Sequence, residues 1–482
     1  MVMKKTWIVF SLIFLFYGAP LFSQSAGSRI QRLVGGHLSV AGTFSSSALS
    51  TFHAGRFTAS GDYLAWMDFY QNPAFSTGIK KPYVAYFMAP PISIHPNRFI
   101  DIDGRVQSAM NNGVANYRAP GLAIEYPQTD LVFRTNQLWG QGLVSFPAGG
   151  MVFTFGYQRP LFLNLNAYLT GIETTISTEV PMGGQTSDVV LNAYLDAAVH
   201  LTFSVDKTSI GGSKIIRNRF AFGFSIDRYG GNVKSQGFAD AQGDMLFNGQ
   251  EYIFNNPNDA WYNKLTQSIS GGYQGSGWRT TWGGWYFYNK SFLFDAVLSM
   301  QSPIRLEGDF NILVNKIPAL NLNALSSNNP NEEILDPAGL DLARLTLTQP
   351  VQNKTYPEML LHLPSYLKLG VLYQKSNLYW YNNVSLKFGY TGVEYGPYKI
   401  GVSSNFDWQS IFGLNHFYIV TKIDAAKTVL DHTGKWGQGG NRVWIPSFAL
   451  GYGRLLRHHY PVQLGLSLLP EPIVYFSTGY QF

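Results

Sequence analysis

The sequence contains no cysteine and few charged residues, and both features restrict what the chain can be. Without cysteine it can form no disulfide, thiolate metal site, cysteine nucleophile or lipidated N-terminal cysteine. Only 13% of its residues are charged, against about 25% in an ordinary soluble domain, while 15% are aromatic. After residue 23, no stretch approaches the roughly 18 unbroken apolar residues of a transmembrane helix. Such a chain must place its apolar side chains by alternation, which is typical of a β-barrel.

The N-terminus has the pattern of a secretory signal peptide. An apolar run follows Lys4 and Lys5 and is too short to span a membrane as a helix. We expect cleavage near Ser23, with Ala26 as the alternative, so that residues 1–23 are removed. Loss of the two lysines lowers the formal net charge from +6 to 6 − 2 = +4, which indicates no nucleic-acid partner.

Alternation with a period of two recurs through most of the remaining chain. Between residues 220 and 227, for example, bulky apolar side chains alternate with small or polar ones. Sixteen segments read as strands: residues 141–147, 151–158, 166–177, 190–205, 220–227, 265–275, 278–288, 291–300, 303–314, 366–374, 384–390, 398–408, 413–423, 442–454, 462–468 and 472–482. Closure with both ends on one side requires an even number, so we predict 14 or 16 strands.

No linker or change in composition divides residues 119–482, which we interpret as one all-β domain, a transmembrane antiparallel β-barrel. Closure is needed because hydrocarbon offers backbone N–H and C=O groups no partner. The predicted brief connections lie near residues 409–412, 375–377, 301–302 and 275–277. The predicted long ones, 229–264 and 316–364, fall on the opposite, extracellular side.

Residues 24–118 have a different composition from the barrel region. They are rich in Gly, Ser and Ala at first and then carry the turn-dense segments Ala89-Pro90-Pro91 and His95-Pro96-Asn97, which are poorly compatible with central strands. We predict that this segment is a plug in the barrel lumen, within which residues 83–88 could form a strand. An exported disordered arm is the alternative.

The last strand resembles the C-terminal assembly signal of bacterial outer-membrane barrels. Phe476 and Tyr480 lie at alternate positions, and the chain ends on the aromatic residue Phe482. This resemblance implies recognition by the barrel-assembly machinery and a location in the bacterial outer membrane.

The motif Asn72-Pro73-Ala74 resembles the FadL family of long-chain fatty acid transporters, in which such a motif lies in an N-terminal hatch inside a 14-stranded barrel. Phe75 follows the motif where the family usually has glycine. Residues 363–371 and 146–157 are similar to strand entries of the family.

The resemblance implies passive uptake of hydrophobic compounds such as long-chain fatty acids, with lipid or another hydrophobic small molecule as the ligand. In this interpretation the hatch motif contacts the ligand path, and a leucine-rich extracellular loop captures the ligand. The candidate capture residues are Leu340, Leu342, Leu345, Leu360 and Leu361. Alternatively, these leucines pack against one another and cap the barrel.

Two other functions remain open for such a barrel. PorV-type barrels, which share the architecture, dock or shuttle partner proteins in secretion, and the extracellular loops here could bind a protein partner. A general porin for polar solutes is less compatible with the apolar loop and the plug.

No pattern indicates an enzyme. Asn415-His416 has no evident serine partner, His458-His459 lacks nearby carboxylates, and Asp101–Gly104 lacks the downstream ligands of a calcium loop. We therefore expect no catalytic residues, no cofactor and no metal.

Overall fold

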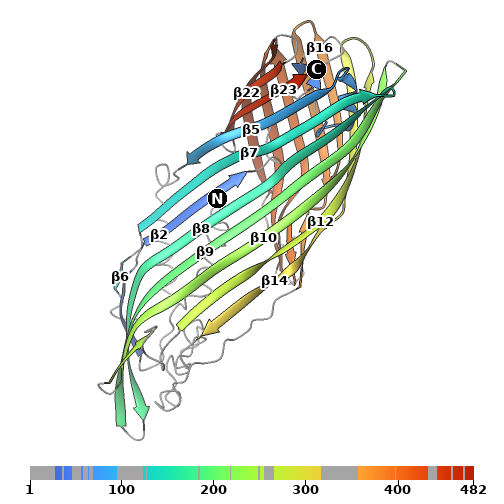
Figure 1. Ribbon diagram of the computed structural model, residues 1–482. Coiled ribbons are helices and arrows are strands. Elements are labelled where there is room, and N and C mark those ends of the chain that lie inside the picture. The colour runs from blue at the N-terminus through green and yellow to red at the C-terminus, as the bar shows by residue number, and fades with distance from the viewer. Residues whose placement is uncertain are drawn as a thin grey trace.

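The computed structural model of the 482-residue chain contains one large sheet that closes on itself as a barrel (Figure 1). The structure describes residues 28–34, 37–45, 56–57, 63–64, 69–94, 123–125, 128–182, 185–217, 219–247, 250–254, 265–315, 357–396, 398–431, 442–456, 460–469 and 473–482. Among these residues, no helix is long and apolar enough to cross a membrane.

The barrel wall has 14 positions, and every neighbouring pair around it is antiparallel. The first six positions are β5 (Tyr83–Ile94), β7 (Gln128–Ala148), β8 (Met151–Met182), β9 (Gln185–Ile216), β10 (Phe220–Phe247) and β12 (Leu265–Phe287). Each of the next three consists of two strands in line: β13 (Phe292–Gln301) with β14 (Ile304–Asn315), β15 (Glu358–His362) with β16 (Ser365–Lys375), and β17 (Leu378–Phe388) with β18 (Thr391–Tyr395). The last five are β19 (Tyr398–Leu414), β20 (Phe417–Asp431), β21 (Arg442–Leu456), β22 (Tyr460–Leu469) and β23 (Ile473–Gln481). The last strand, β23, pairs with both β22 and β5, and this closes the barrel.

The predicted all-β barrel is confirmed, with the lower of the two predicted strand numbers. Three pairs of predicted strands are single wall positions: 151–158 with 166–177 in β8, 265–275 with 278–288 in β12, and 291–300 with 303–314 in β13 and β14. One position, β5, comes from the segment predicted to be a plug, so the count is 16 − 3 + 1 = 14. The β8 pattern misled because a register shift between Gln158 and Leu161 changes the phase of the alternation without ending the strand.

The wall therefore begins at Tyr83 and not at residue 119. Residues 24–118 contribute two further strands, β1 (Ser28–Val34) and β2 (His37–Ser45). Strand β2 lies between β7 and β8, and it is parallel to β7 and antiparallel to β8. The remaining short elements are β3 (Arg56–Phe57), β4 (Tyr63–Leu64), β6 (Ala123–Glu125), β11 (Gln250–Phe254) and the 3-10 helix η1 (Pro73–Gly78).

Short turns lie at the end that carries the C-terminus (Figure 1). The predicted brief connection at 375–377 is one of them, between β16 and β17. The other three predicted brief connections were wrong: 409–412 lies within β19, 275–277 within β12, and 301–302 at the junction of β13 and β14. Of the predicted long connections, 316–364 begins after β14 but its last residues form β15, while much of 229–264 belongs to β10 and β11.

Three neighbouring wall positions are interrupted at the same level. Pro303 separates β13 from β14, Pro364 separates β15 from β16, and Gly389, with φ +97, separates β17 from β18. The two prolines have no N–H to donate to the ladder, and the glycine adopts a backbone conformation that L side chains rarely adopt. The wall consequently bends here without losing its strand order.

Near the C-terminal end, the outer face of the wall is apolar and the inner face is polar. On β10, Phe222 and Ile226 are 38% and 46% exposed to the outside, whereas Ser225 and Asp227 are 5% and 2% exposed. This arrangement suits a barrel whose outer surface contacts lipid and whose lumen is wetter. It confirms the assignment of faces made from the alternation.

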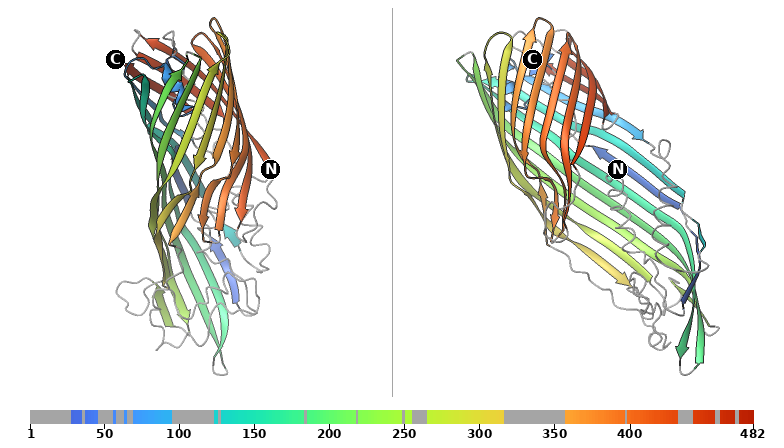
Figure 2. Two further views of the ribbon diagram at one scale, coloured as in Figure 1. Left: turned by 90° about the vertical axis from the view of Figure 1, so that its right-hand side faces the viewer. Right: turned by 180° about the vertical axis from the view of Figure 1, so that it is seen from behind.

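Strands β8 and β9 have 32 residues each, against 9 in β23, and they continue far beyond the short strands of the opposite wall (Figures 1 and 2). In this continuation the polarity of the two faces reverses. On β9 the outward positions become Thr202 and Ser204, while the inward position Val205 is only 1% exposed. We call this part of the sheet, formed by the far portions of β8, β9, β10, β12 and β14, the extension.

Candidate functional site

The Asn72-Pro73-Ala74 motif lies against the inner face of the barrel wall and is completely buried. Asn72 caps the 3-10 helix η1, its side-chain oxygen accepting a hydrogen bond of 3.0 Å from the backbone N–H of Ala74. Pro73 fits the first helical turn because that position requires no N–H donor. Helix η1 contacts β8, β9, β10 and β12.

Hydrogen bonds attach this segment to the wall on several sides. The Asn72 side-chain amide donates to the Gly284 carbonyl at 3.2 Å and to the Asp295 carboxylate at 3.4 Å. The Trp285 indole donates to the Ala74 carbonyl at 3.0 Å, and the Lys368 ammonium donates to the Gln71 carbonyl at 2.7 Å. These bonds involve both backbone and side-chain groups of the motif, so its position is specified and does not depend on apolar contact alone.

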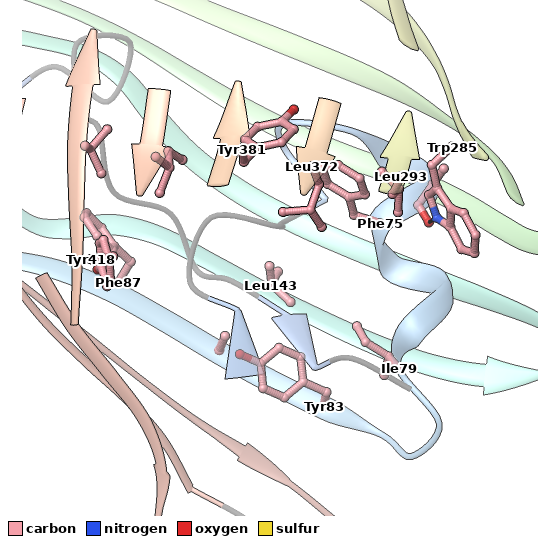
Figure 3. Close-up of a cluster of buried hydrophobic side chains, with 14 of the residues drawn as sticks. Phe75, Ile79, Tyr83, Phe87, Leu143, Trp285, Leu293, Leu372, Tyr381 and Tyr418 are labelled. Atoms are coloured by element: carbon pink, nitrogen blue, oxygen red, sulfur yellow. Dashed lines mark hydrogen bonds between the residues drawn. The ribbon is translucent and has the colours of Figure 1, made fainter. Parts of the chain in front are cut away.

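Two glycines of the wall make room for the motif. A Cβ on Gly223 would collide with the backbone nitrogen of Ala74, and one on Gly283 would collide with the side-chain oxygen of Asn72. Apolar side chains complete the packing: Phe75 and Ile79 belong to one buried cluster with residues of the wall, and Phe75 lies beside Leu293 and Leu372 (Figure 3).

A layer of cations and aromatic rings lies between the motif and the extension. Lys207, on β9, forms a buried ion pair with Asp227 at 3.3 Å and stands 5.0 Å from the ring centroid of Tyr70. The Arg279 guanidinium lies 5.1 Å from the ring of Tyr229 and donates to a backbone carbonyl of the wall. Cation–π contacts that are shielded from water are worth about 2 kcal/mol each, so this layer is held firmly.

Beyond that layer the interior is apolar. We call the residues concerned the upper cluster: Val205, Tyr229, Val233, Tyr273, Ile304, Leu306, Met359 and Leu361, with half-buried neighbours that include Leu161, Leu201, Phe203 and Phe310. The Tyr273 hydroxyl donates to that of Tyr395 at 3.2 Å, which satisfies a polar group in apolar surroundings. The upper cluster continues along the inner face of β8, where Ala167 and Leu169 are 3% and 4% exposed.

The predicted capture residues divide into two groups. Leu340, Leu342 and Leu345 lie outside the described residues. Leu360 and Leu361 were predicted to be in a loop, but they belong to strand β15 of the wall. Leu361 faces inward in the upper cluster, whereas the alternating geometry of the strand turns Leu360 to the other face. The predicted loop, residues 316–364, wrongly included β15, because this strand has only five residues and ends before Pro364.

The predicted assembly-signal residues occupy the outer face of β23 and the end of the chain. Tyr480 contacts Phe482 edge-on, with ring centroids 4.7 Å apart, and Phe482 is 59% exposed. Phe476 pairs with Leu464 of β22 and Met88 of β5, at the seam that closes the barrel.

Sequence reasoning did not find Lys207, Arg279 or the tyrosines around them. The sequence does contain a signal of a change at this level, because the alternation of apolar and polar residues changes phase within β8. On β8 the aromatic residues Phe153, Phe155 and Tyr157 face outward, but after the register shift the leucines at 161, 163 and 165 face inward. A change of phase inside one strand indicates that its environment changes from lipid to water.

The residues considered for chemistry do not gather at a catalytic site in the described part of the chain. His416 is exposed in a turn and contacts the edge of the Tyr452 ring. His458-His459 and Asp101–Gly104 lie outside the described residues. No group of three or more metal-binding side chains occurs among the residues that the structure describes.

The site and fold together define an antiparallel barrel. Its lumen is polar and partly filled toward the C-terminal end, and its interior is apolar toward the extension. No protein-family model and no curated protein sequence matches the chain. Solved structures similar to it include the toluene transporter TodX of Pseudomonas putida, with 10% identity, TM-score 0.39 and coverage of 86% of this chain and 93% of that one. A second is the Ralstonia pickettii toluene transporter TbuX, with 11% identity, TM-score 0.37 and coverage of 86% of this chain and 92% of that one. A third is a Pseudomonas aeruginosa FadL homologue, with 10% identity, TM-score 0.34 and coverage of 85% of this chain and 93% of that one.

Proposed function

We propose that the chain is a bacterial outer-membrane channel for passive uptake of hydrophobic compounds. The observation that carries this proposal is the upper cluster, an apolar interior in the part of the barrel that extends past the lipid-facing band. An interior lined with Val233, Tyr273 and Leu306 offers an oily solute a favourable environment after it leaves water. A porin for polar solutes would have no use for this lining.

The N-terminal segment acts as the plug in this proposal. Asn72, Pro73 and Ala74 block direct descent from the upper cluster, and the cation layer at Lys207 and Arg279 separates the two levels. A ligand passes when the segment shifts and its hydrogen bonds to the wall break. Long-chain fatty acids are the ligand class that we propose, captured first by Leu340, Leu342 and Leu345.

The proposal is tested with a polar substitution in the upper cluster. Val233→Asn places an amide in the apolar lining, which costs a bound apolar ligand about 1–3 kcal/mol and so reduces its occupancy about fivefold or more. We expect a similar reduction in uptake of radiolabelled oleate by cells of a Gram-negative host that lacks its own fatty acid channel. Toluene serves as a second probe for the class of ligand.

Lys234→Asn is the matched control, because Lys234 follows Val233 on β10 and faces outward. Its uptake rate should equal that of the unchanged protein, and heat-modifiable migration on gels should show that both variants form barrels. Equal uptake by the Val233→Asn and Lys234→Asn proteins would refute an apolar route through the upper cluster. Docking of a secretion partner would then be the remaining function for the barrel.

A further inference from the structure

The end of the barrel that carries the C-terminus is surrounded by exposed basic side chains. We call this set the basic rim: Lys80, Lys81, Lys214, Arg217, Arg219, Lys290, Lys375 and Arg454, all exposed. They come from the chain just before β5, from the end of β9 and the turn after it, from the turn after β12, and from the ends of β16 and β21. These positions are distributed around the circumference and do not form a patch on one side.

Acidic side chains do not balance the basic rim in the part of the chain that the structure describes. The aspartates on the adjoining stretches of wall, Asp227, Asp295, Asp407 and Asp424, are 2% to 8% exposed and belong to the inner face. Asp407 and Asp424 also form ion pairs with the Lys387 ammonium, at 2.7 Å and 3.0 Å. Apart from the terminal carboxylate of Phe482, the outer surface at this end is therefore positively charged.

The outer surface at the other boundary of the lipid-facing band is different. There, charges of both signs occur and form pairs: Arg159 with Asp206 at 2.7 Å, Arg305 with Glu358 at 2.8 Å, and Lys399 with Glu394 at 3.0 Å. Among the described residues, a basic excess thus occurs at the C-terminal boundary only. General solubility does not explain it, because solubility would be served by charge at either end.

Large exposed aromatic residues stand beside the basic side chains. Tyr288 and Phe292 flank Lys290 and are 63% and 37% exposed, and Phe220, 40% exposed, follows Arg219. Trp380, on the strand after Lys375, is 50% exposed. Aromatic residues of this kind settle at the level of lipid headgroups, with the ring toward hydrocarbon and the polar edge toward water. The basic rim therefore lies at headgroup level.

We propose that the basic rim binds the anionic headgroups of phospholipids in the leaflet that surrounds the C-terminal end of the barrel. Juxtamembrane lysines and arginines attract anionic lipids by about 1 kcal/mol each, and each cation can also donate hydrogen bonds to phosphate oxygens. The barrel thus recruits a shell of anionic lipid at one leaflet. The inference concerns lipid recognition and does not depend on what passes through the lumen.

The distribution of the cations favours lipid over a soluble acidic protein as the partner. A globular partner would contact one side of the rim, and cations on the opposite side could not reach it. Lipid headgroups surround the whole barrel and can occupy every position of the rim. The aromatic neighbours also fit a membrane interface, since they would otherwise be exposed to water.

The test uses the full-length barrel reconstituted in phosphatidylcholine bilayers that contain phosphatidylglycerol as the minority lipid. Electron paramagnetic resonance with spin-labelled phosphatidylglycerol or phosphatidylcholine measures which lipid is immobilised at the protein surface. We expect a severalfold preference for phosphatidylglycerol that declines with added KCl, since one nearby cation contributes about a factor of five at low ionic strength. A combined Arg217→Gln, Arg219→Gln, Lys290→Gln, Lys375→Gln variant removes four of the eight rim cations and should lower the preference well below that of the unchanged protein.

The matched control removes four outward cations from the other boundary: Arg228→Gln, Lys234→Gln, Arg305→Gln and Lys399→Gln. Its lipid preference should equal that of the unchanged protein. If the fourfold rim variant does not assemble, the double variant Lys290→Gln, Lys375→Gln should still lower the preference measurably. An unchanged preference in the rim variants, an equal loss in the control, or no preference in the unchanged protein would overturn the proposal.

Discussion

At the scale of single residues, the specificity of the lumen depends on glycines as much as on the side chains that they admit. Gly223 and Gly283 lie on neighbouring wall strands and leave space for the backbone of Ala74 and the side chain of Asn72. Asn72 then forms three hydrogen bonds that a buried amide requires. A glycine in a strand usually weakens it, and here the close approach of a second segment offsets that cost.

We expect Gly283→Ala to displace the N-terminal segment while leaving the barrel closed. The new Cβ would collide with the Asn72 side chain and displace it. The buried Asp295 carboxylate would then lose its hydrogen bond from the Asn72 amide, which costs about 1–3 kcal/mol of stability. Limited proteolysis should show faster cleavage near residues 69–79, with unchanged heat-modifiable migration of the barrel.

Gly212→Ala provides the comparison, because a Cβ there would meet side chains and no backbone: the Phe224 ring at 3.4 Å, Met151 at 3.5 Å and Phe153 at 3.9 Å. Its cleavage pattern should match that of the unchanged protein. Equal protection of residues 69–79 in the Gly283→Ala protein would show that the motif does not depend on this contact.

At the scale of elements, the terminal strand β23 has two separable properties. Its pairing with β5 closes the barrel, and the backbone N–H of Phe482 donates to the Pro82 carbonyl at 3.0 Å. The Phe482 side chain, by contrast, is largely exposed and contacts Tyr480. Backbone pairing therefore accounts for stability, and we propose that the exposed aromatic ring serves recognition during assembly.

Phe482→Ala should consequently slow assembly and change stability little. We expect a lower rate of appearance of the folded, heat-resistant form when the assembly machinery is present, and a free energy of unfolding in urea within about 0.5 kcal/mol of the original. Phe417→Ala, at another exposed aromatic residue of the same end, is the control and should assemble at the original rate. Equal assembly rates for the two variants would contradict a role for the terminal ring.

The difficulty of predicting elements from the sequence is clear in β8, β12 and β5. Period-two alternation identified the outward faces correctly wherever a strand stays in lipid, as in β10 and β22, because one environment enforces one pattern. A register shift or a run of glycines interrupts that pattern without ending the strand, so β8 and β12 were each read as two. Strand β5 was read as an optional strand of the plug because the three residues from Ala89 include two prolines.

At the scale of the whole molecule, the barrel occupies two environments in succession. The outer face is apolar from the C-terminal turns to about Ile226 on β10, and it becomes mostly polar from Arg228 onward, with Phe238 and Leu246 as exposed apolar exceptions. The inner face changes in the opposite sense. The extension therefore stands in water, with its apolar side turned inward.

Cysteine labelling can locate this boundary, because the natural sequence has no cysteine to interfere. We expect Thr202→Cys, on the outer face of β9 in the extension, to react with a membrane-impermeant maleimide on intact cells. Phe222→Cys, on the outer face of β10 within the apolar band, should stay unlabelled until the membrane is dissolved in detergent. Equal labelling of the two positions on intact cells would contradict the proposed depth of the barrel.

The candidate site was predictable in part. Asn72-Pro73-Ala74 could be singled out because a short motif with a helix-capping residue followed by proline is visible in one stretch of sequence. The upper cluster could not, because Val205, Tyr273 and Leu306 are separated by many residues and meet only through the registers of β9, β10, β12 and β14. Of the two predicted capture residues that the structure describes, Leu360 and Leu361, only Leu361 lies in this cluster.

The sequence by itself determined that the chain is an all-β barrel and which positions face outward where a strand stays in lipid. These properties follow from local periodicity and composition, since lipid contact imposes the same rule on each strand separately. Only the tertiary structure decided that 14 wall positions close the sheet and that Tyr83 begins the wall. Those properties depend on hydrogen-bond registers between strands far apart in the chain, and no single strand contains that information.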